Sequence, residues 1–252
     1  MIRAFFFAFI FFVTHSTIFM LYPFTFHKFL IFFFLYTSGT IFMIYLIFYP
    51  RSQLLVSNRS QVHCPEKRCI ALTFDDGPSG ENTREILRIL REKNVKVTFF
   101  VIGKQAEENP EQIVQSIQDG HFVANHTYSH PNLFCFLTPS RLRKEIEGCS
   151  AVIERITGMK PRFFRSPVGL RHPLLQYCLK KANLEYISWN SRIFDTFNQN
   201  PELLKKRLYR KIRAGNIVLL HDGTNQNVKN IIGMLPEIID EFKSLGYMFV
   251  QP

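Results

Sequence analysis

The sequence predicts an α/β protein in which parallel strands form a small barrel covered by helices, preceded by a membrane-anchor region. Three observations lead to this prediction. The first fifty residues are almost entirely apolar, whereas the rest has the hydrophobicity of a globular domain. After residue 68, short apolar runs alternate with amphipathic helical patterns, as in parallel sheets with helices outside. Ionisable residues follow five of these runs.

The N-terminal region ends near residue 50. Of the 31 Lys and Arg and 20 Asp and Glu in the chain, only Arg3 and Lys28 lie in residues 1–50. Phe29 to Tyr49 is a run of 21 uncharged residues, and about 20 apolar residues suffice to span a bilayer as a helix. Ala4 to Tyr22 is a weaker second candidate because four consecutive polar residues interrupt it. We therefore expect residues 1–50 to be an anchor with one or two transmembrane helices.

The anchor is expected to be uncleaved, since no small-residue cleavage signature follows either segment. A buried core helix is the alternative for Phe29–Tyr49. With one span and the N-terminus inside, the globular part lies outside the cytoplasm, which is the arrangement we expect. Two spans would return it to the cytoplasm, and Arg51 and Arg59 favour that option by the positive-inside rule.

The net charge of +11 is compatible with anionic cell-wall polymers, acidic lipid headgroups or nucleic acid. No basic run is interleaved with aromatic residues, so we expect no nucleic-acid partner. A buried thiol is expected at Cys149, on the apolar stripe of a helical pattern. A bridge between Cys64 and Cys69 stays open, because spacing alone cannot establish it. The five cysteines are Cys64, Cys69, Cys135, Cys149 and Cys178.

Seven apolar runs predict strands. They are Ile70–Phe74, Val95–Val101, His121–Ala124, Arg162–Phe164, Leu184–Trp189, Ile217–Leu220 and Tyr247–Val250. Seven strands within about 185 residues favour a small barrel over an open sheet, although the pattern alone does not separate the two. We expect residues 51–67 to be a linker and residues 68–252 to be the globular domain.

Helical patterns with recognisable ends lie between these runs. One helix is expected between Thr138 and Gly158, with Thr138 as the N-cap. Asn200-Pro201 opens another, and a final helix closes at Gly246. Pro236 either bends this last helix or marks its first turn.

Ionisable residues after the strands indicate a site. In a βα-barrel, the loops that follow the strands form one face, and that face carries the chemistry. Five separate segments therefore deliver polar groups to the same end, which favours a functional site over unrelated surface residues. They are Asp75-Asp76, residues 125–130 (NHTYSH), Arg165, Asp195 and His221-Asp222.

His126 and His130 indicate a metal. Their spacing of four places both imidazoles on one side if the segment makes a helical turn. One carboxylate from Asp75-Asp76 would complete a set of two His and one Asp, with positions left open for water and substrate. Such a set suits zinc, and also cobalt, nickel or iron. The second carboxylate would then stay free as a base.

At this point the sequence resembles a family. TFDDGP (73–78), NHTYSH (125–130), FRSPVG (164–169), Asp195 and LLHDG (219–223), in this order, resemble the polysaccharide deacetylases of carbohydrate esterase family 4, the NodB-like domain. The resemblance covers about residues 68–250. It implies a distorted (β/α)7 barrel, in agreement with the seven expected strands.

The resemblance also implies roles for the residues of the first three motifs. Asp76, His126 and His130 are expected to bind the metal, and Asp75 to be the general base. Arg165 is expected to hold Asp75 in position through a charge-assisted hydrogen bond.

Further roles follow for the later motifs. His221 is expected to be the general acid, with Asp195 orienting it and raising its pKa. The backbone N–H of Val168 is expected to stabilise the oxyanion. The sequence departs from the family pattern where an aromatic residue, usually Tyr, is replaced by Val168, and where Thr196 replaces the Trp that often follows the Asp. Both departures concern the surface that contacts the sugar. Trp189, the single tryptophan of the chain, is expected in the core instead.

The expected function is metal-dependent hydrolysis of acetyl groups on N-acetylated sugars of a polysaccharide or cell-wall glycan. Metal-activated water, an Asp base and a His acid would carry it, with zinc as the expected metal and cobalt or nickel as alternatives. O-acetylated sugars are the alternative substrates. A second hydrolase reading is a deformylase or deacetylase of a lipid-linked aminosugar, held at the membrane by the anchor. A non-catalytic carbohydrate-binding protein would predict a broken metal set or a missing base, and neither break is present.

Overall fold

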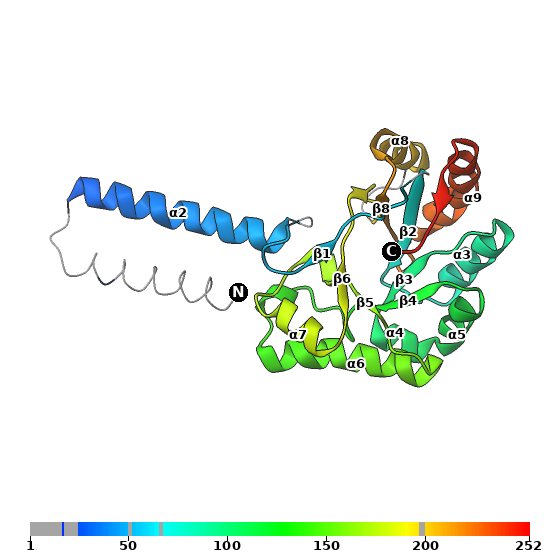
Figure 1. Ribbon diagram of the computed structural model, residues 1–252, viewed down its shortest axis with the longest axis horizontal. Coiled ribbons are helices and arrows are strands. Elements are labelled where there is room, and N and C mark those ends of the chain that lie inside the picture. Colours follow the sequence, from blue (N-terminus) through cyan, green and yellow to red (C-terminus); the bar gives the residue numbers. More distant parts are fainter. Residues whose placement is uncertain (1–16, 18–24, 50–51, 66–67, 197–199) are drawn as a thin grey trace.

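The computed structural model describes residue 17 and residues 25–49, 52–65, 68–196 and 200–252. In this part of the chain, one curled sheet lies inside a layer of helices, and helix α2 (Phe26–Phe48) projects away from it (Figure 1). The second anchor candidate, Ala4 to Tyr22, lies outside the described residues apart from Thr17.

The sheet is built from parallel strands, which confirms the predicted fold class. Its order is β1-β6-β5-β4-β3-β2-β8-β7, with β9 pairing separately to β2. Every ladder between these strands is parallel. Among the described residues the end strands β1 and β7 do not pair with each other, so the curled sheet is a distorted, incompletely closed barrel. The strands are β1 (Asn58–Arg59), β2 (Cys69–Asp75), β3 (Thr98–Val101), β4 (Phe122–Asn125), β5 (Phe163–Phe164), β6 (Glu185–Ile187), β7 (Ser191–Arg192), β8 (Asn216–His221) and β9 (Met248–Phe249).

All seven predicted strands are present, and the sequence missed β1 and β7. Both missed strands have two residues, too few to give an apolar run or an alternating pattern. They lie at the two ends of the strand order, where a short pairing suffices to finish the sheet.

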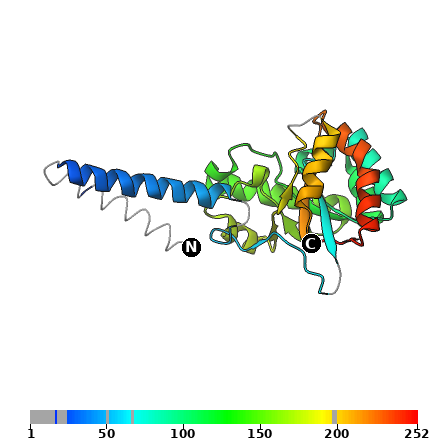
Figure 2. The ribbon, with the colours of Figure 1, turned by 90° about the horizontal axis from the view of Figure 1, so that it is seen from above.

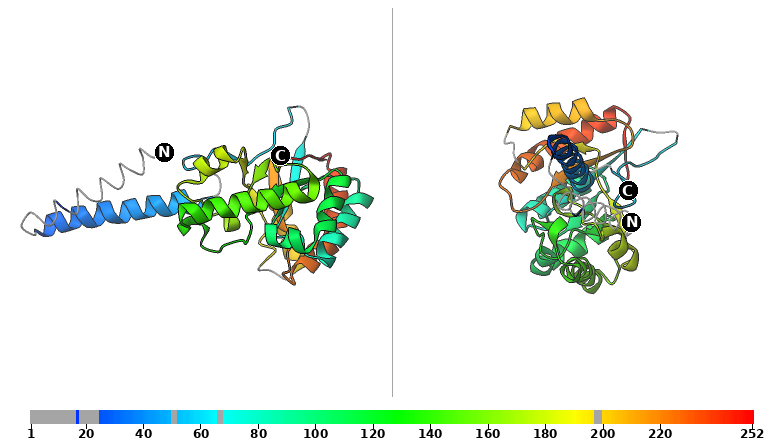
Figure 3. Two further views of the ribbon diagram at one scale, coloured as in Figure 1. Left: turned by 90° about the horizontal axis from the view of Figure 1, so that it is seen from below. Right: turned by 90° about the vertical axis from the view of Figure 1, so that its left-hand side faces the viewer.

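Helices cover the outside of the sheet, as the two side views of Figure 3 show. The predicted helix after Thr138 is confirmed, because the Thr138 hydroxyl accepts the Arg141 N–H and Gly158 ends the helix in the left-handed region at φ 73°. The remaining elements are α3 (Glu81–Glu92), α4 (Gly103–Glu108), α5 (Pro110–Gln118), η1 (Phe134–Phe136), α6 (Pro139–Thr157), η2 (Pro167–Gly169), α7 (Leu175–Lys181), α8 (Pro201–Lys211) and α9 (Val228–Ser244).

The later helix signals are also confirmed. The Asn200 side chain accepts the N–H of Leu203 and caps α8. Pro236 lies inside α9 (Val228–Ser244), so it does not mark the first turn of this helix.

The register of the strands explains why the polar residues meet. Asp75 at the end of β2 pairs with His221 at the end of β8, and Asn125 at the end of β4 pairs with Phe164 at the end of β5. The next residues, Asp76, His126 and Arg165, therefore leave the sheet at one edge. All seven residues of β2 are buried, as expected for a parallel strand between other layers.

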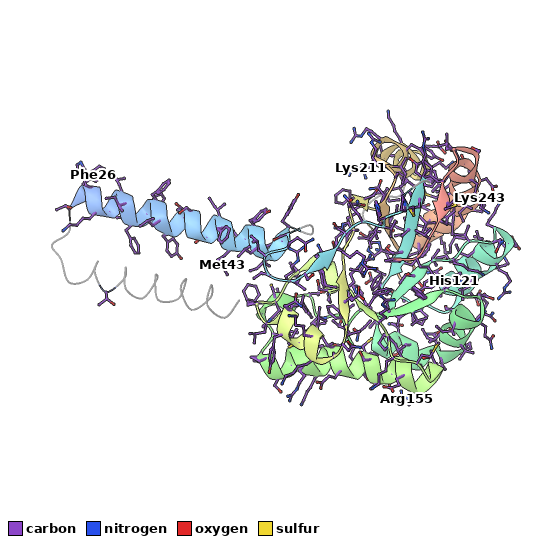
Figure 4. All side chains as sticks on the ribbon, in the orientation of Figure 1. Phe26, Met43, His121, Arg155, Lys211 and Lys243 are labelled. Atoms are coloured by element: carbon purple, nitrogen blue, oxygen red, sulfur yellow. A yellow bond between two sulfur atoms is a disulfide. The ribbon has the colours of Figure 1, made fainter. Side chains whose placement is uncertain are left out.

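The helix α2 is, in the described part of the chain, the one helix long and apolar enough to cross a bilayer by length and composition. Its 23 residues extend over about 35 Å at 1.5 Å per residue. Seen from above, it continues the long axis of the molecule (Figure 2). Its side chains, from Phe26 to Met43, point outward around the helix (Figure 4), and most of its large apolar side chains are exposed.

Residues 52–65, within the segment expected to be a linker, pack against the barrel. Leu55 and Val56 are buried, β1 pairs with β6, and Gln61 forms an isolated bridge with Asn216. The question left open for the cysteines is also answered, since a disulfide joins Cys64 to Cys69. The segment is therefore fixed to the start of β2.

The other three cysteines are free thiols, and Cys149 is buried in the core as expected.

Candidate active site

Three predicted metal ligands meet at the edge where β2 and β4 end. The Asp76 Oδ1 atom lies 3.4 Å from His126 Nε2 and 3.3 Å from His130 Nε2, and one donor atom from each residue falls within 4.8 Å of the others. A tetrahedral zinc ion with bonds of about 2.0 Å separates its ligand atoms by about 3.3 Å. The two distances from Asp76 match this spacing, so the two-His, one-Asp donor set suits a zinc-sized cation.

The two histidines converge without a helical turn, so that part of the sequence hypothesis is wrong. Residues 126–130 form a loop in which Thr127 (φ 72°) and His130 (φ 51°) have left-handed backbone conformations. The Asn125 side-chain oxygen accepts the Thr127 N–H at 2.8 Å, and the Thr127 hydroxyl accepts the His130 N–H at 3.1 Å. These local bonds hold a conformation that is unusual for non-glycine residues.

The ring of His126 is oriented for metal binding. Its Nδ1 atom lies 2.8 Å from the carbonyl oxygen of Arg165, so this nitrogen carries the proton and Nε2 is left as the ligand atom. Burial opposes protonation of His126, but the carboxylates of Asp75 and Asp76 outweigh it and raise the pKa. Burial and the neighbouring His126 lower the pKa of His130.

Asp76 is half-buried, as is His130, and stays ionised. Burial opposes the charge, but hydrogen bonding and charge from His126, together with His221 and His130, bring the pKa of Asp76 below its usual range. Its backbone is left-handed, with φ 77°, which turns the carboxylate away from the direction of Asp75.

Glu145 supports the histidine loop and was missed by the sequence analysis. This buried residue of α6 accepts the Ser129 N–H at 2.8 Å and the Ser129 hydroxyl at 2.7 Å. A signal was present, because Glu145 lies on the same helical stripe as Leu142 and Cys149. A carboxylate on a buried stripe needs polar partners, which the loop supplies.

Asp75 is held by Arg165, as expected. Arg165 is fully buried, and its Nη1 donates to Asp75 Oδ1 at 2.6 Å. The same nitrogen donates to the Thr73 hydroxyl at 2.8 Å, and the guanidinium lies 3.9 Å from the centre of the Phe100 ring. Burial lowers the pKa of Arg165 despite its acidic partner. The second carboxylate oxygen of Asp75 lies 3.9 Å from His126 Nε2, so it faces the metal ligands.

His221 and Asp195 form a second buried pair. His221 Nδ1 donates to the Asp195 carboxylate, with distances of 2.9 and 3.0 Å to its two oxygens. Burial opposes protonation, but the hydrogen bond and charge of Asp195 outweigh it and raise the pKa of His221 to about 9. The imidazolium is therefore available as a proton donor at neutral pH.

Asp222 is a further acid to which the sequence gave no role. Its side chain is buried and accepts the Thr83 hydroxyl at 2.7 Å. Burial, with the charges of Asp76 and Asp75, raises the pKa of Asp222 to about 7. A Cβ at Gly77 would lie 2.1 Å from an Asp222 oxygen, so the turn after Asp76 requires glycine there.

Val168, three residues after Arg165, has an exposed side chain and a left-handed backbone (φ 55°). Its N–H has no acceptor in the described part of the chain. The following Gly169 packs against Trp189, where a Cβ would come within 2.6 Å of the indole ring. Trp189 is buried, as expected.

Comparisons with known proteins agree with this arrangement. The sequence model of the polysaccharide deacetylase family matches residues 63–187. Two peptidoglycan-N-acetylglucosamine deacetylases of Bacillus cereus are 33% and 32% identical to the chain, over 72% and 73% of it. The matched regions cover 66% and 86% of these relatives.

Solved structures show the same fold. A peptidoglycan N-acetylglucosamine deacetylase superimposes with a TM-score of 0.70 at 31% identity, covering 77% of this chain and 89% of that one. A structure described as a pseudoenzyme of carbohydrate esterase family 4 from Bacillus anthracis also has a TM-score of 0.70, at 28% identity, covering 77% of this chain and 66% of that one. The fold alone therefore does not decide activity.

Replacing His126 with Ala should weaken zinc binding by at least about 100-fold, because even second-shell partners of metal ligands contribute 10- to 100-fold to affinity. Zinc content after dialysis and a competition titration would measure this. His63→Ala, at an exposed histidine outside the site, is the control and should bind zinc normally. Unchanged zinc affinity in the His126 variant would remove this residue from the ligand set.

Proposed function

The chain belongs to the polysaccharide deacetylase family, and from this premise we propose that it is a metal-dependent hydrolase that removes N-acetyl groups from aminosugars of a cell-wall glycan. The relatives reported above include enzymes named for N-acetylglucosamine in peptidoglycan, and a Bacillus subtilis relative 28% identical over 80% of this chain is named for N-acetylmuramic acid. That relative is covered over 41% of its length. Residues 68–252 are proposed as the catalytic domain.

One observation carries this proposal. The donor set of Asp76, His126 and His130 lies beside a carboxylate, Asp75, that a buried arginine holds in place. The three ligands without a nearby base would be equally compatible with a structural metal site. A carboxylate without the ligands would be compatible with an ordinary turn. A base 3.9 Å from a ligand atom, with its other oxygen occupied by Arg165, suits hydrolysis.

A divalent cation in this donor set would polarise the acetyl carbonyl and lower the pKa of an adjacent water molecule. Asp75 accepts the proton of the attacking water through the oxygen that Arg165 leaves free. Because Arg165 is buried and holds the other oxygen, the free oxygen of Asp75 is kept facing the ligand set.

Two further groups complete the reaction. The N–H of Val168 donates to the oxygen of the former carbonyl as negative charge develops on it. His221 then protonates the departing amine, while Asp195 holds the imidazole through Nδ1. A free amine and acetate are released.

A lipid-linked aminosugar is the second candidate substrate. The observation that favours it is that α2 ends directly against the domain, with Ile47 packed on the cluster that includes Leu170 and Leu175. An active site joined in this way to an anchor stays close to the bilayer, where such substrates reside.

We propose that the catalytic domain lies outside the cytoplasm, anchored through residues 1–50. The Cys64–Cys69 disulfide supports this, since such bonds persist in oxidising compartments. Arg59, one of the basic residues that favoured the opposite orientation, pairs with Glu185 at 2.6 Å. A C-terminal reporter should be active outside the cytoplasm, and Cys64 should react with alkylating reagents in cells only after reduction. Cytoplasmic reporter activity would contradict the proposal.

Replacing Asp75 with Asn should lower kcat by about 10²- to 10⁴-fold, the range of general base catalysis, while zinc binding is retained. Acetate release from peptidoglycan, chitin oligomers and a lipid-linked aminosugar would also rank the substrates. Asp240→Asn, at an exposed aspartate paired with Lys93, is the control.

Asp75 is buried against Arg165, so folding of the variant is checked by its unfolding transition; breaking a buried pair costs roughly 3–5 kcal/mol. Full activity in the Asp75 variant would refute the base assignment. A folded, zinc-loaded wild-type protein inactive on all three substrates would favour the non-catalytic alternative.

Replacing Asp195 with Asn should move the basic limb of the pH profile to lower pH. His221, with a pKa of about 9, is protonated below that pH and loses its proton as the pH rises. Without Asp195 the pKa of His221 falls toward the ordinary value of about 6.5, because burial is then opposed only by the smaller contributions of the Asp75 and Asp76 charges, and the limb shifts by about two pH units. A bound cation lowers the pKa of His221, and with it the basic limb, in both proteins. The difference in pH between their two basic limbs is therefore the informative quantity.

The profile of kcat/KM from pH 6 to 10 measures this shift, with Asp240→Asn again as the control. Identical profiles for wild type and the Asp195 variant would exclude His221 as the acid that Asp195 tunes.

A further inference from the structure

Arg171 is a fully buried arginine that the proposed reaction does not use. In the described part of the chain its guanidinium contacts no carboxylate. Its Nη1 donates to the carbonyl oxygens of Tyr49 and, at 3.4 Å, of Leu46, and its backbone N–H donates to that of Ile47 at 3.2 Å. All three acceptors belong to the end of α2. Arg171 therefore forms hydrogen bonds that join the end of α2 to the domain.

These contacts give partners to the end of the helix and to one guanidinium nitrogen. The last carbonyls of a helix lack partners within the helix and carry partial negative charge. A buried guanidinium is costly without hydrogen bonds, and Arg171 makes its hydrogen bonds through Nη1, while Nε and Nη2 have no partner among the described residues. The Tyr45 carbonyl is occupied by the Tyr49 N–H, and the Arg171 groups take the carbonyls that follow. The ring of Tyr186, 5.8 Å from the guanidinium, adds a cation–π contact.

Apolar packing supports the same contact. Leu46 is the buried residue of α2, and Ile47 packs against the cluster that contains Leu170, Leu175 and Tyr186. The end of α2 therefore completes part of the core of the domain. Removal of residues 26–49 would take away the hydrogen-bond acceptors of the Arg171 guanidinium, the carbonyls of Leu46 and Tyr49.

Arg171 is connected to the candidate active site in two ways, through the chain and through Tyr186. Arg171 ends the segment that begins at Arg165 and includes Val168. The Tyr186 hydroxyl, on the ring that Arg171 faces, lies 2.8 Å from the Ser166 hydroxyl, next to Arg165. Val168 has a left-handed backbone, and such a conformation persists only when its surroundings hold it.

We propose that α2 is retained as a structural part of the catalytic domain, and that Arg171, by capping its C-terminal carbonyls, is a positioning residue for the segment that carries the Val168 N–H. This inference rests on the proposed function for its effect on catalysis. The docking contact itself does not, so the two fail separately.

The test compares full-length protein in lipid nanodiscs with Arg171→Met, Arg171→Lys and the control Arg88→Met, at an exposed arginine of α3 that pairs with Glu85 and Glu92. Hydrogen exchange should accelerate about 10-fold or more in peptides covering residues 45–52 and 165–171 of the Met variant. Its kcat should fall about 10-fold, less than the 10²- to 10³-fold of losing an oxyanion donor outright. KM and zinc affinity should stay within about 2-fold of wild type.

The Lys variant should recover most of both losses, because an ammonium group still offers donors and positive charge to the carbonyls. A Lys variant no better than the Met variant would overturn the capping contact. Faster exchange in 165–171 with unchanged kcat would overturn the positioning role. A mature chain from membranes that begins after residue 49, by intact mass, would overturn retention of α2. If wild type has no deacetylase activity, the proposed function fails, while the exchange data still decide the docking.

Discussion

The guanidinium of Arg165 lies inside the barrel rather than at its rim, and the geometry of the site depends on that position. Its partners come from β2, β3 and the end of β6, so one side chain ties three parts of the sheet together. They are Asp75, Thr73, the carbonyls of Ile187 and Ser188, and the ring of Phe100. Because an unpaired buried charge is costly, any movement of Asp75 away from Arg165 is opposed by the core itself. The direction of the base is thus fixed by packing and not by the surface loops.

The same logic separates the acids gathered at this end of the barrel. Asp75 is paired with Arg165, Asp195 with His221, and Asp76 with the two histidines. Asp222 has a hydroxyl as its partner instead, and its pKa rises to about 7 because it is buried near the others. The gathering of carboxylates at this edge would favour a bound cation, since a positive ion beside Asp76 would relieve the repulsion among neighbours that burial keeps close.

The strands and their polar ends were predictable from the sequence, because β2 and β8 are long apolar runs and parallel strands bring their ends together. The candidate metal ligands were predicted from the His-x-x-x-His spacing together with the family resemblance. The backbone that joins His126 to His130 was not, since left-handed residues leave no periodic signal. Strands β1 and β7 were too short to detect. The docking of α2 was invisible for a different reason: Arg171 and Tyr49 are far apart in sequence, and a lone arginine after a loop reads as a surface residue. The position of Glu145 on a buried helical stripe was visible in the sequence. Its role could be assigned only from the structure, which shows that it accepts hydrogen bonds from Ser129 of the histidine loop.

Backbone strain links these features. Four non-glycine residues of the site, Asp76, Thr127, His130 and Val168, have positive φ values, and each such conformation costs roughly 1–3 kcal/mol. Thr127 and Val168 are β-branched, for which this backbone is least favourable. Side-chain hydrogen bonds support three of these positions: Asn125 Oδ1 accepts the Thr127 N–H, the Thr127 hydroxyl accepts the His130 N–H, and the Tyr186 hydroxyl pairs with that of Ser166, two residues before Val168. Since Val168 is proposed to act through its N–H, the identity of its side chain is free to vary, whereas the contacts that fix its backbone are not. The replacement of an aromatic residue by valine at this position therefore changes the wall of the pocket. The proposed hydrolysis depends instead on the buried residues that fix the backbone of Val168.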